Sequence, residues 1–233
     1  MYDNCIIIDP KKHHHYSFIM LHPMFSNSDY FNNFIEYFSK LDNFQNIKFI
    51  LPESPIMNID YPNNKHYNAK SWYNYYTCYN NISKVDDIDL NDFVEQSNRI
   101  KNIIINEAIL LKNFNNIFII GISQGGTLLF NILNKLPTNI GGLFCIKSIY
   151  MDKYIRLRNN KNTPIFIFSG NLDNIYNIKF QKKTFKILKK RNYNIKHSII
   201  KNLDHHKIIK KEFDFIINNF FRAVKINNNF NIT

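Results

Sequence analysis

Long uninterrupted apolar runs are missing from this 233-residue sequence. A helix that crosses a bilayer needs about 20 consecutive apolar residues, and the N-terminus also lacks the basic-then-apolar pattern of a secretory signal. Cysteine is scarce, and its three residues show neither a disulfide framework nor metal-ligand spacing; they are Cys5, Cys78 and Cys145. The sequence therefore predicts a cytoplasmic protein with reduced thiols and no metal site.

Acidic residues are few, with 18 Asp and Glu against 30 Lys and Arg, and the formal net charge is +12. A nucleic-acid binder is expected to gather its basic residues in one patch with exposed aromatic residues between them. Here the lysines are spread along the chain and the aromatic residues fall at core spacing, so we predict no nucleic-acid partner. The most basic stretch, residues 179–191, interleaves apolar residues with lysines as an amphipathic helix does. Its basic face makes peripheral contact with an anionic membrane a secondary hypothesis.

Glycine is scarce too, with six residues, and two of them flank a serine. The string Gly121-Ile122-Ser123-Gln124-Gly125 follows a buried-strand pattern and leads directly into a helix pattern, which is the context of a nucleophile elbow. Side chains at the two glycine positions would collide with the strained backbone of such a turn. The helix N-terminus also directs N–H groups to the point where negative charge develops in acyl transfer. Ser123 is therefore the candidate nucleophile.

Strand and helix patterns alternate along the chain. Strands are expected at 16–21, 47–51, 116–120, 140–149, 164–168 and 195–200, and helices at 28–40, 91–112, after Ser123, at 178–191 and at 207–221. Such alternation predicts a single α/β domain with a mostly parallel central sheet and helices on both faces. We assign residues 1–15 to an N-terminal lead-in, 16–224 to the domain and 225–233 to a flexible C-terminal tail. Residues 53–89 are expected to form a long irregular segment.

Acid and base candidates follow the strands that come after the elbow. Sites in parallel sheets lie where the carboxyl ends of the strands open into loops. Asp173 follows the strand at 164–168, and the pair His205-His206 follows the strand at 195–200. The resulting order of nucleophile, acid and base is that of the α/β-hydrolases. In that chemistry a histidine takes the serine proton, and a carboxylate holds the ring and stabilises the imidazolium.

Two residues compete for each of these roles. We favour His205 over His206 as the base because His205 lies three residues after Asn202 at the end of the strand. Asp204 is the alternative acid, but its side chain is expected to point away from its immediate neighbour His205. Asp173 is therefore the better candidate.

The oxyanion of the reaction needs two backbone N–H donors near Ser123. In this fold one donor belongs to the residue after the nucleophile, here Gln124, and the other to the loop after an early strand. That loop begins with His22 and Pro23. Because proline has no N–H, Met24 is the candidate for the second donor.

These motifs resemble those of the acyl-protein thioesterase family, also called the phospholipase/carboxylesterase family. The matching strings are Leu21-His22-Pro23-Met24, Leu51-Pro52-Glu53-Ser54-Pro55, Ser71-Trp72-Tyr73, Gly121-Ile122-Ser123-Gln124-Gly125-Gly126 and Gly170-Asn171-Leu172-Asp173. The resemblance implies the α/β-hydrolase fold and a cofactor-free serine hydrolase with Ser123 as nucleophile, Asp173 as acid and His205 as base. It implies thioesters of S-acylated proteins, or carboxylic and lysophospholipid esters, as substrates. The chain departs from the family at Pro23 and at Phe25-Ser26, where glycine and Gly-Asp are usual.

An acyl chain needs an apolar wall beside the nucleophile. The substrate-binding candidates come from segments expected to rim the site; they are Leu21, Phe25, Trp72 and Tyr73, with Met24, Tyr75 and Tyr76 beside them. We therefore predict an acyl-protein thioesterase that acts on S-acylated proteins. A carboxylesterase or lysophospholipase for small or lipid esters is the first alternative, and a catalytically inactive binding protein with the hydrolase fold is the second.

Overall fold

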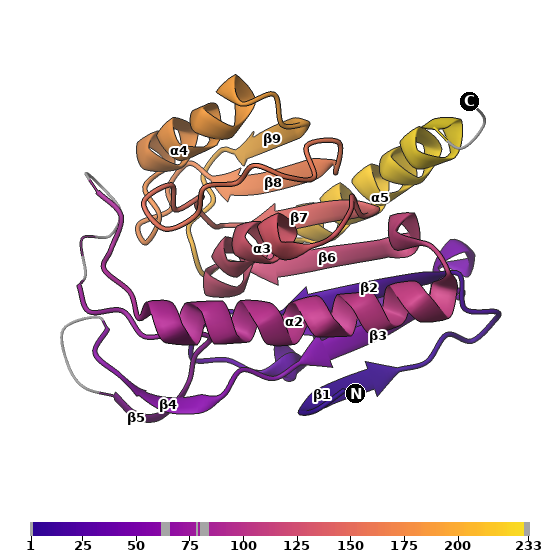
Figure 1. Ribbon diagram of the computed structural model, residues 1–233, viewed down its shortest axis with the longest axis horizontal. Helices are drawn as coiled ribbons and strands as arrows, with labels where there is room; N and C mark the ends of the chain where they lie inside the picture. The colour runs from indigo at the N-terminus through magenta and orange to yellow at the C-terminus, as the bar shows by residue number, and fades with distance from the viewer. Residues whose placement is uncertain (1, 62–65, 78, 80–83, 231–233) are drawn as a thin grey trace.

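The computed structural model describes residues 2–61, 66–77, 79 and 84–230, and Cys78 lies outside them. A seven-stranded sheet forms its centre (Figure 1). From one edge to the other the strands are β1 (Cys5–Ile8), β3 (Ile47–Pro52), β2 (Tyr16–Leu21), β6 (Ile117–Ile122), β7 (Gly142–Ile146), β8 (Ile165–Gly170) and β9 (Ile195–Ile200). β1 runs antiparallel to β3, and the other neighbours in this sheet are parallel. The prediction of a mostly parallel central sheet is confirmed.

Helices cover both faces of the sheet. One face carries α2 (Leu90–Leu111), α3 (Gln124–Lys135) and α4 (Ile178–Lys190), and the opposite face carries α1 (Asn32–Ser39) and α5 (Lys210–Phe230). In Figure 1, α2 and α3 cross in front of the strands and α5 runs behind them. Short 3₁₀ turns are η1 (Ser28–Phe31), η2 (Asp42–Phe44) and η3 (Phe114–Asn116).

The core follows from the two-residue alternation of side chains along each strand. In β2, Ile19 packs in the cluster that includes α2 and α3, whereas Phe18 and Met20 pack in the cluster that includes α1 and α5. All six residues of β6 are buried, as expected for a central parallel strand with helices on both sides. This burial fixes the position of the turn that follows β6, which contains Ser123.

Three stretches differ from the sequence predictions. The lead-in contains β1, which pairs with β3 through Cys5 to Ile8. The segment expected to be irregular contains a two-stranded antiparallel sheet of β4 (Ile56–Ile59) and β5 (His66–Lys70). The strands of both elements are short and many of their residues are exposed. Their sequences therefore lack the alternation of apolar and polar residues that predicts a strand. The expected strand at 140–149 is shorter and spans only β7.

The C-terminal helix α5 continues to Phe230, past residue 225 where we expected a frayed tail. Asparagine is a weak helix former, which is why the asparagine-rich end was not assigned to the helix. In the structure Asn227 is buried, and its side-chain Nδ2 donates to the carbonyl oxygen of Gly141 at 3.2 Å. A tertiary contact thus stabilises helix that local propensity does not favour. Within the described residues, no helix combines the length and apolarity that a membrane span requires.

Candidate active site

Ser123 lies in the sharp turn between β6 and α3. Its backbone has φ 53° and ψ −116°, a strained conformation for a residue with a side chain. A Cβ at Gly121 would come within 2.6 Å of the Gly125 carbonyl oxygen, and a Cβ at Gly125 within 2.6 Å of the Leu21 carbonyl oxygen. The two glycines therefore let the strand, the turn and α3 approach closely enough to lift the serine above the sheet.

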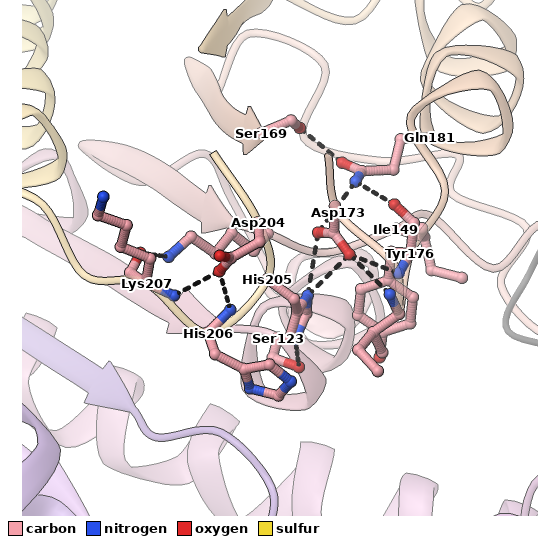
Figure 2. Close-up of polar contacts among 12 residues, drawn as sticks. Ser123, Ile149, Ser169, Asp173, Tyr176, Gln181, Asp204, His205, His206 and Lys207 are labelled. Atoms are coloured by element: carbon pink, nitrogen blue, oxygen red, sulfur yellow. Dashed lines mark hydrogen bonds and ion pairs between the residues drawn. The ribbon is translucent and has the colours of Figure 1, made fainter. Parts of the chain in front are cut away.

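A chain of hydrogen bonds joins Ser123, His205 and Asp173 (Figure 2). Ser123 Oγ lies 2.9 Å from His205 Nε2, and His205 Nδ1 lies 3.0 and 2.9 Å from the two carboxylate oxygens of Asp173. With the carboxylate ionised, Nδ1 carries the ring proton and Nε2 is free to accept the proton of the serine hydroxyl. The three side chains are largely buried, so water screens these contacts little.

The carboxylate of Asp173 is held in place on its other side. Its Oδ1 accepts the backbone N–H groups of Ile175 at 3.0 Å and Tyr176 at 2.7 Å. Gln181 Nε2 lies 3.4 Å from Oδ2 and donates to the Tyr176 carbonyl oxygen at 2.5 Å. These bonds fix the orientation of the carboxylate toward His205.

The alternative acid and base lie elsewhere. Asp204 is exposed, and its Oδ1 accepts the N–H groups of His206 at 2.9 Å and Lys207 at 2.8 Å, which closes the turn locally (Figure 2). These two N–H bonds lower the pKa of the Asp204 carboxyl, that of Lys207 the more strongly. His206 is exposed beside the cavity, and its ring centre lies 5.3 Å from that of His205. The hydrogen bonds to Ser123 and Asp173 are made by His205.

The two candidate oxyanion donors come from residues beside Ser123. Met24 and Gln124 both line the cavity there, and neither N–H donates to another described residue. Gln124 is the first residue of α3, where the helix dipole adds partial positive charge. This pair can stabilise the oxyanion that forms when Ser123 Oγ adds to the carbonyl carbon of a substrate.

The Gln124 side chain joins the elbow to a distant segment. Its Nε2 donates to the Tyr73 carbonyl oxygen at 2.7 Å, and its Oε1 accepts the Trp72 N–H at 2.9 Å. The indole N–H of Trp72 donates in turn to the His22 carbonyl oxygen at 2.8 Å, in the loop that carries Met24. One buried amide thus helps to hold the two proposed oxyanion donors at a constant separation.

His22 lies close to the site but is not arranged as a base. Its Nδ1 lies 2.8 Å from the Pro23 carbonyl oxygen, and its Nε2 accepts the Ser54 N–H at 3.0 Å. Burial lowers the pKa of this imidazole. In the neutral imidazole, Nδ1–H donates to the Pro23 carbonyl oxygen and Nε2 accepts from Ser54, so neither nitrogen is left to act as a base. The residue stabilises the loop before Met24.

A cavity of about 220 Å³ opens beside Ser123 and His205. Its walls include Met24, Phe25, Tyr61, Tyr75, Ile175 and Tyr176. Of the four predicted substrate-binding residues, Phe25 lines it, while Leu21, Trp72 and Tyr73 are completely buried and do not. These three were expected at the rim because of the segments that carry them, but their apolar side chains pack inward against the sheet and α3.

Sequence reasoning missed Ile175 and Tyr176 as wall residues. Their closeness to Asp173 along the chain is the signal that could have found them, since the loop that carries the acid also borders the cavity. Tyr61 comes from the irregular segment, where the sequence holds no comparable signal. Across the described residues, no group of three or more His, Cys, Asp or Glu side chains is arranged to hold a metal ion.

A family model described as phospholipase/carboxylesterase matches residues 2–224. The chain belongs to the phospholipase/carboxylesterase family. Two similar proteins are acyl-protein thioesterase 1 homolog 1 of Dictyostelium discoideum, 28% identical over 164 residues (69% of this chain and 70% of that protein), and acyl-protein thioesterase 1 of Kluyveromyces lactis, 27% identical over 160 residues (66% and 68%). The family and these relatives support a hydrolase of the thioesterase/carboxylesterase type.

Solved structures similar to this family member share its fold. Arabidopsis thaliana SOBER1 has a TM-score of 0.77 at 21% identity and covers 90% of this chain and 99% of its own. Zea mays acyl-protein thioesterase 2 has a TM-score of 0.76 at 14% identity, with coverage of 95% and 99%. The Bacillus cereus carboxylesterase has a TM-score of 0.73 at 15% identity, with coverage of 94% and 93%. The prediction of an α/β-hydrolase fold is thereby confirmed.

Proposed function

We propose that this protein is a serine hydrolase that cleaves acyl thioesters and esters, and that acyl-protein thioesterase activity is its main function. The observation that carries the proposal is the chain of hydrogen bonds from Ser123 Oγ through His205 to Asp173 at the edge of an apolar cavity. The two similar proteins are named acyl-protein thioesterases, which supports the choice of thioesters.

In the proposed reaction, Ser123 Oγ attacks the carbonyl carbon of the substrate while His205 Nε2 takes the hydroxyl proton. Asp173 stabilises the imidazolium that results. The N–H groups of Met24 and Gln124 donate to the oxyanion of the tetrahedral intermediate. Its collapse transfers the proton from His205 to the departing thiolate or alkoxide and leaves an acyl-enzyme, which water hydrolyses with His205 again as base.

The proposed substrates are S-acylated proteins in the cytoplasm, with the acyl chain in the cavity. Its apolar walls suit a hydrocarbon, since each methylene removed from water adds up to about 0.8 kcal/mol of binding. Anionic membrane surfaces are proposed as a secondary contact. The exposed side of α4 supports this contact, because its lysines point outward while its phenylalanines are buried.

A carboxylesterase or lysophospholipase remains the second candidate, because the family model spans those activities. Purified protein should be offered matched thioesters and oxygen esters of increasing chain length. We expect kcat/KM to rise from acetyl to medium and long acyl thioesters. A flat or falling profile would favour the carboxylesterase.

A fluorophosphonate probe separates both enzymes from an inactive binding protein, because the probe reacts only with an activated serine. Ser123→Ala should abolish labelling and turnover while the circular dichroism spectrum stays unchanged. Turnover retained in this variant would refute the nucleophile assignment.

A further inference from the structure

Lys147 is a lysine buried directly after β7. Only 1% of the residue is exposed, and its backbone takes a left-handed conformation with φ 48°. Its side-chain Nζ donates to the Lys207 carbonyl oxygen at 2.5 Å and lies 2.6 Å from Glu212 Oε1. A buried ammonium is costly unless it is paired and hydrogen-bonded, and both partners here belong to the segment from the His205 loop to the start of α5.

The backbone around Lys147 belongs to the nucleophile side of the site. Ser123 N–H donates to the carbonyl oxygen of Ile146 at 2.9 Å, one residue before Lys147. Lys147 N–H donates to the Phe168 carbonyl oxygen at 2.7 Å, in the strand that leads to the acid. The lysine side chain therefore connects a rigid part of the sheet, which carries Ser123, to a loop that carries His205.

The His205 loop is held from outside on both sides of the imidazole. Asp204 closes the turn by accepting the His206 and Lys207 N–H groups, so the backbone conformation of the turn is stabilised by local bonds. These local bonds do not set the position of the turn relative to β6. The start of the loop is held to the loop after β8, where Leu172 N–H donates to the Leu203 carbonyl oxygen at 3.0 Å. On the other side of His205, two residues after the imidazole that must reach Ser123 Oγ, Lys147 Nζ donates to the Lys207 carbonyl oxygen.

Glu212 provides the counter-charge for this ammonium. It is 3% exposed, and burial raises the pKa of its carboxyl while the ammonium beside it opposes that rise. Its N–H donates to the Ile209 carbonyl oxygen at 2.9 Å, at the start of α5. The pair therefore ties the end of the His205 loop and the first turn of α5 to the end of β7.

We propose that Lys147 is a positioning residue for hydrolysis, which holds the His205 loop against the nucleophile strand through the Lys207 carbonyl oxygen and the Glu212 carboxylate. The inference rests on the proposed function, because it assigns His205 as the base. A misplacement of about 1 Å in a catalytic constellation can cost about 10²-fold in rate. Loss of the contact should therefore lower kcat and leave KM nearly unchanged, since the cavity wall does not include Lys147.

The test variant is Lys147→Met with Glu212→Gln, which removes both charges and leaves neither buried alone. The matched control is Lys48→Met with Glu107→Gln. This second buried pair has Nζ and Oε1 2.8 Å apart, and it joins the first half of β3 to α2, away from the cavity. Kinetics on one thioester, melting temperature and hydrogen exchange of residues 203–209 are measured for both.

We expect the Lys147 double variant to lose about 10- to 10²-fold in kcat, with KM within about two-fold and faster exchange in residues 203–209. The control should keep kcat within about two-fold even where its melting temperature falls. Unchanged kcat and exchange in a folded Lys147 double variant would overturn the proposal. An equal kcat loss in the control would overturn it too, because the effect would then follow stability.

Two further outcomes are also decisive. If the double variant does not fold, Lys147→Met is measured alone, because Glu212 can take up a proton when the ammonium is absent. If the wild-type protein hydrolyses none of the esters and ignores the fluorophosphonate, the proposed function fails. The exchange rates then still decide whether Lys147 holds the His205 loop, since faster exchange supports this contact and unchanged exchange refutes it.

Discussion

Replacing Asp173 with asparagine tests the proposed acid with almost no change in side-chain volume. Its Oδ1 accepts the N–H groups of Ile175 and Tyr176 at 3.0 and 2.7 Å, which requires an oxygen at that position. Asparagine is therefore expected to keep its carbonyl oxygen there. Its NH₂ group then takes the place of Oδ2, facing His205 Nδ1, which lies 2.9 Å from Oδ2 in the native structure.

His205 Nδ1 would then face the retained oxygen, 3.0 Å away in the native structure, and the new NH₂ donor at the shorter contact. Two donors facing each other repel, so this contact favours the tautomer in which Nδ1 accepts. The ring proton would then sit on Nε2 and point at Ser123 Oγ, in the tautomer that cannot take the serine proton. The imidazolium would also lose its counter-charge. A substitution of this kind in a serine hydrolase lowers kcat by about 10⁴-fold, which corresponds to about 5 kcal/mol of barrier.

Asp204→Asn is the matched control, because the asparagine oxygen can still accept the two N–H groups that close the exposed turn. We expect kcat of this variant to stay within about three-fold of the wild type, because the exposed Asp204 carboxylate bonds the turn and not Ser123 or the His205 ring, and surface substitutions of this kind usually change stability by less than about 0.5 kcal/mol. Steady-state kinetics with one thioester compare the two variants, and circular dichroism confirms their folding. The reasoning is wrong if Asp204→Asn is the more damaging change, or if Asp173→Asn retains more than about a tenth of the wild-type kcat.

Three other predictions concern histidines and lysines. His205→Ala should lower kcat by more than about 10²-fold, whereas His206→Ala should be mild, and paired kinetics with the reverse ranking would move the base by one residue. Burial lowers the pKa of His197 to about 4, below about 6.5 in the unfolded chain. The unfolded state therefore takes up the proton first, and stability should fall by roughly 2 to 3 kcal/mol as the pH drops from about 6.5 to about 4. Denaturant titrations of His197→Gln should lack this fall, and an unchanged pH dependence would contradict it. Vesicles with anionic lipid should sediment more protein than neutral vesicles, and Lys182→Glu with Lys186→Glu should remove the difference; equal sedimentation of the wild type would contradict the membrane contact.

The sequence by itself determined the order of the buried strands and the long helices, and the candidates for nucleophile, acid and base. The six residues of β6 are apolar because the strand is covered on both faces, so they form a continuous run in the sequence. Gly121 is required by its close approach to the backbone of Gly125, four residues along the chain. Such features depend on neighbours along the chain, and periodicity and spacing therefore predict them.

Tertiary structure decided the features that depend on contacts between distant segments. His205 and His206 are adjacent and chemically identical, and only the path of the loop after β9 brings one of them within 2.9 Å of Ser123 Oγ. Trp72 was expected at the cavity, yet its indole N–H donates to the His22 carbonyl oxygen and its ring is fully buried. Lys147 reads in the sequence as one of many lysines. Its partners, the Lys207 carbonyl oxygen and the Glu212 carboxylate, lie 60 and more residues away along the chain. Only the folded chain brings them to the buried ammonium, so local spacing in the sequence does not reveal the pair.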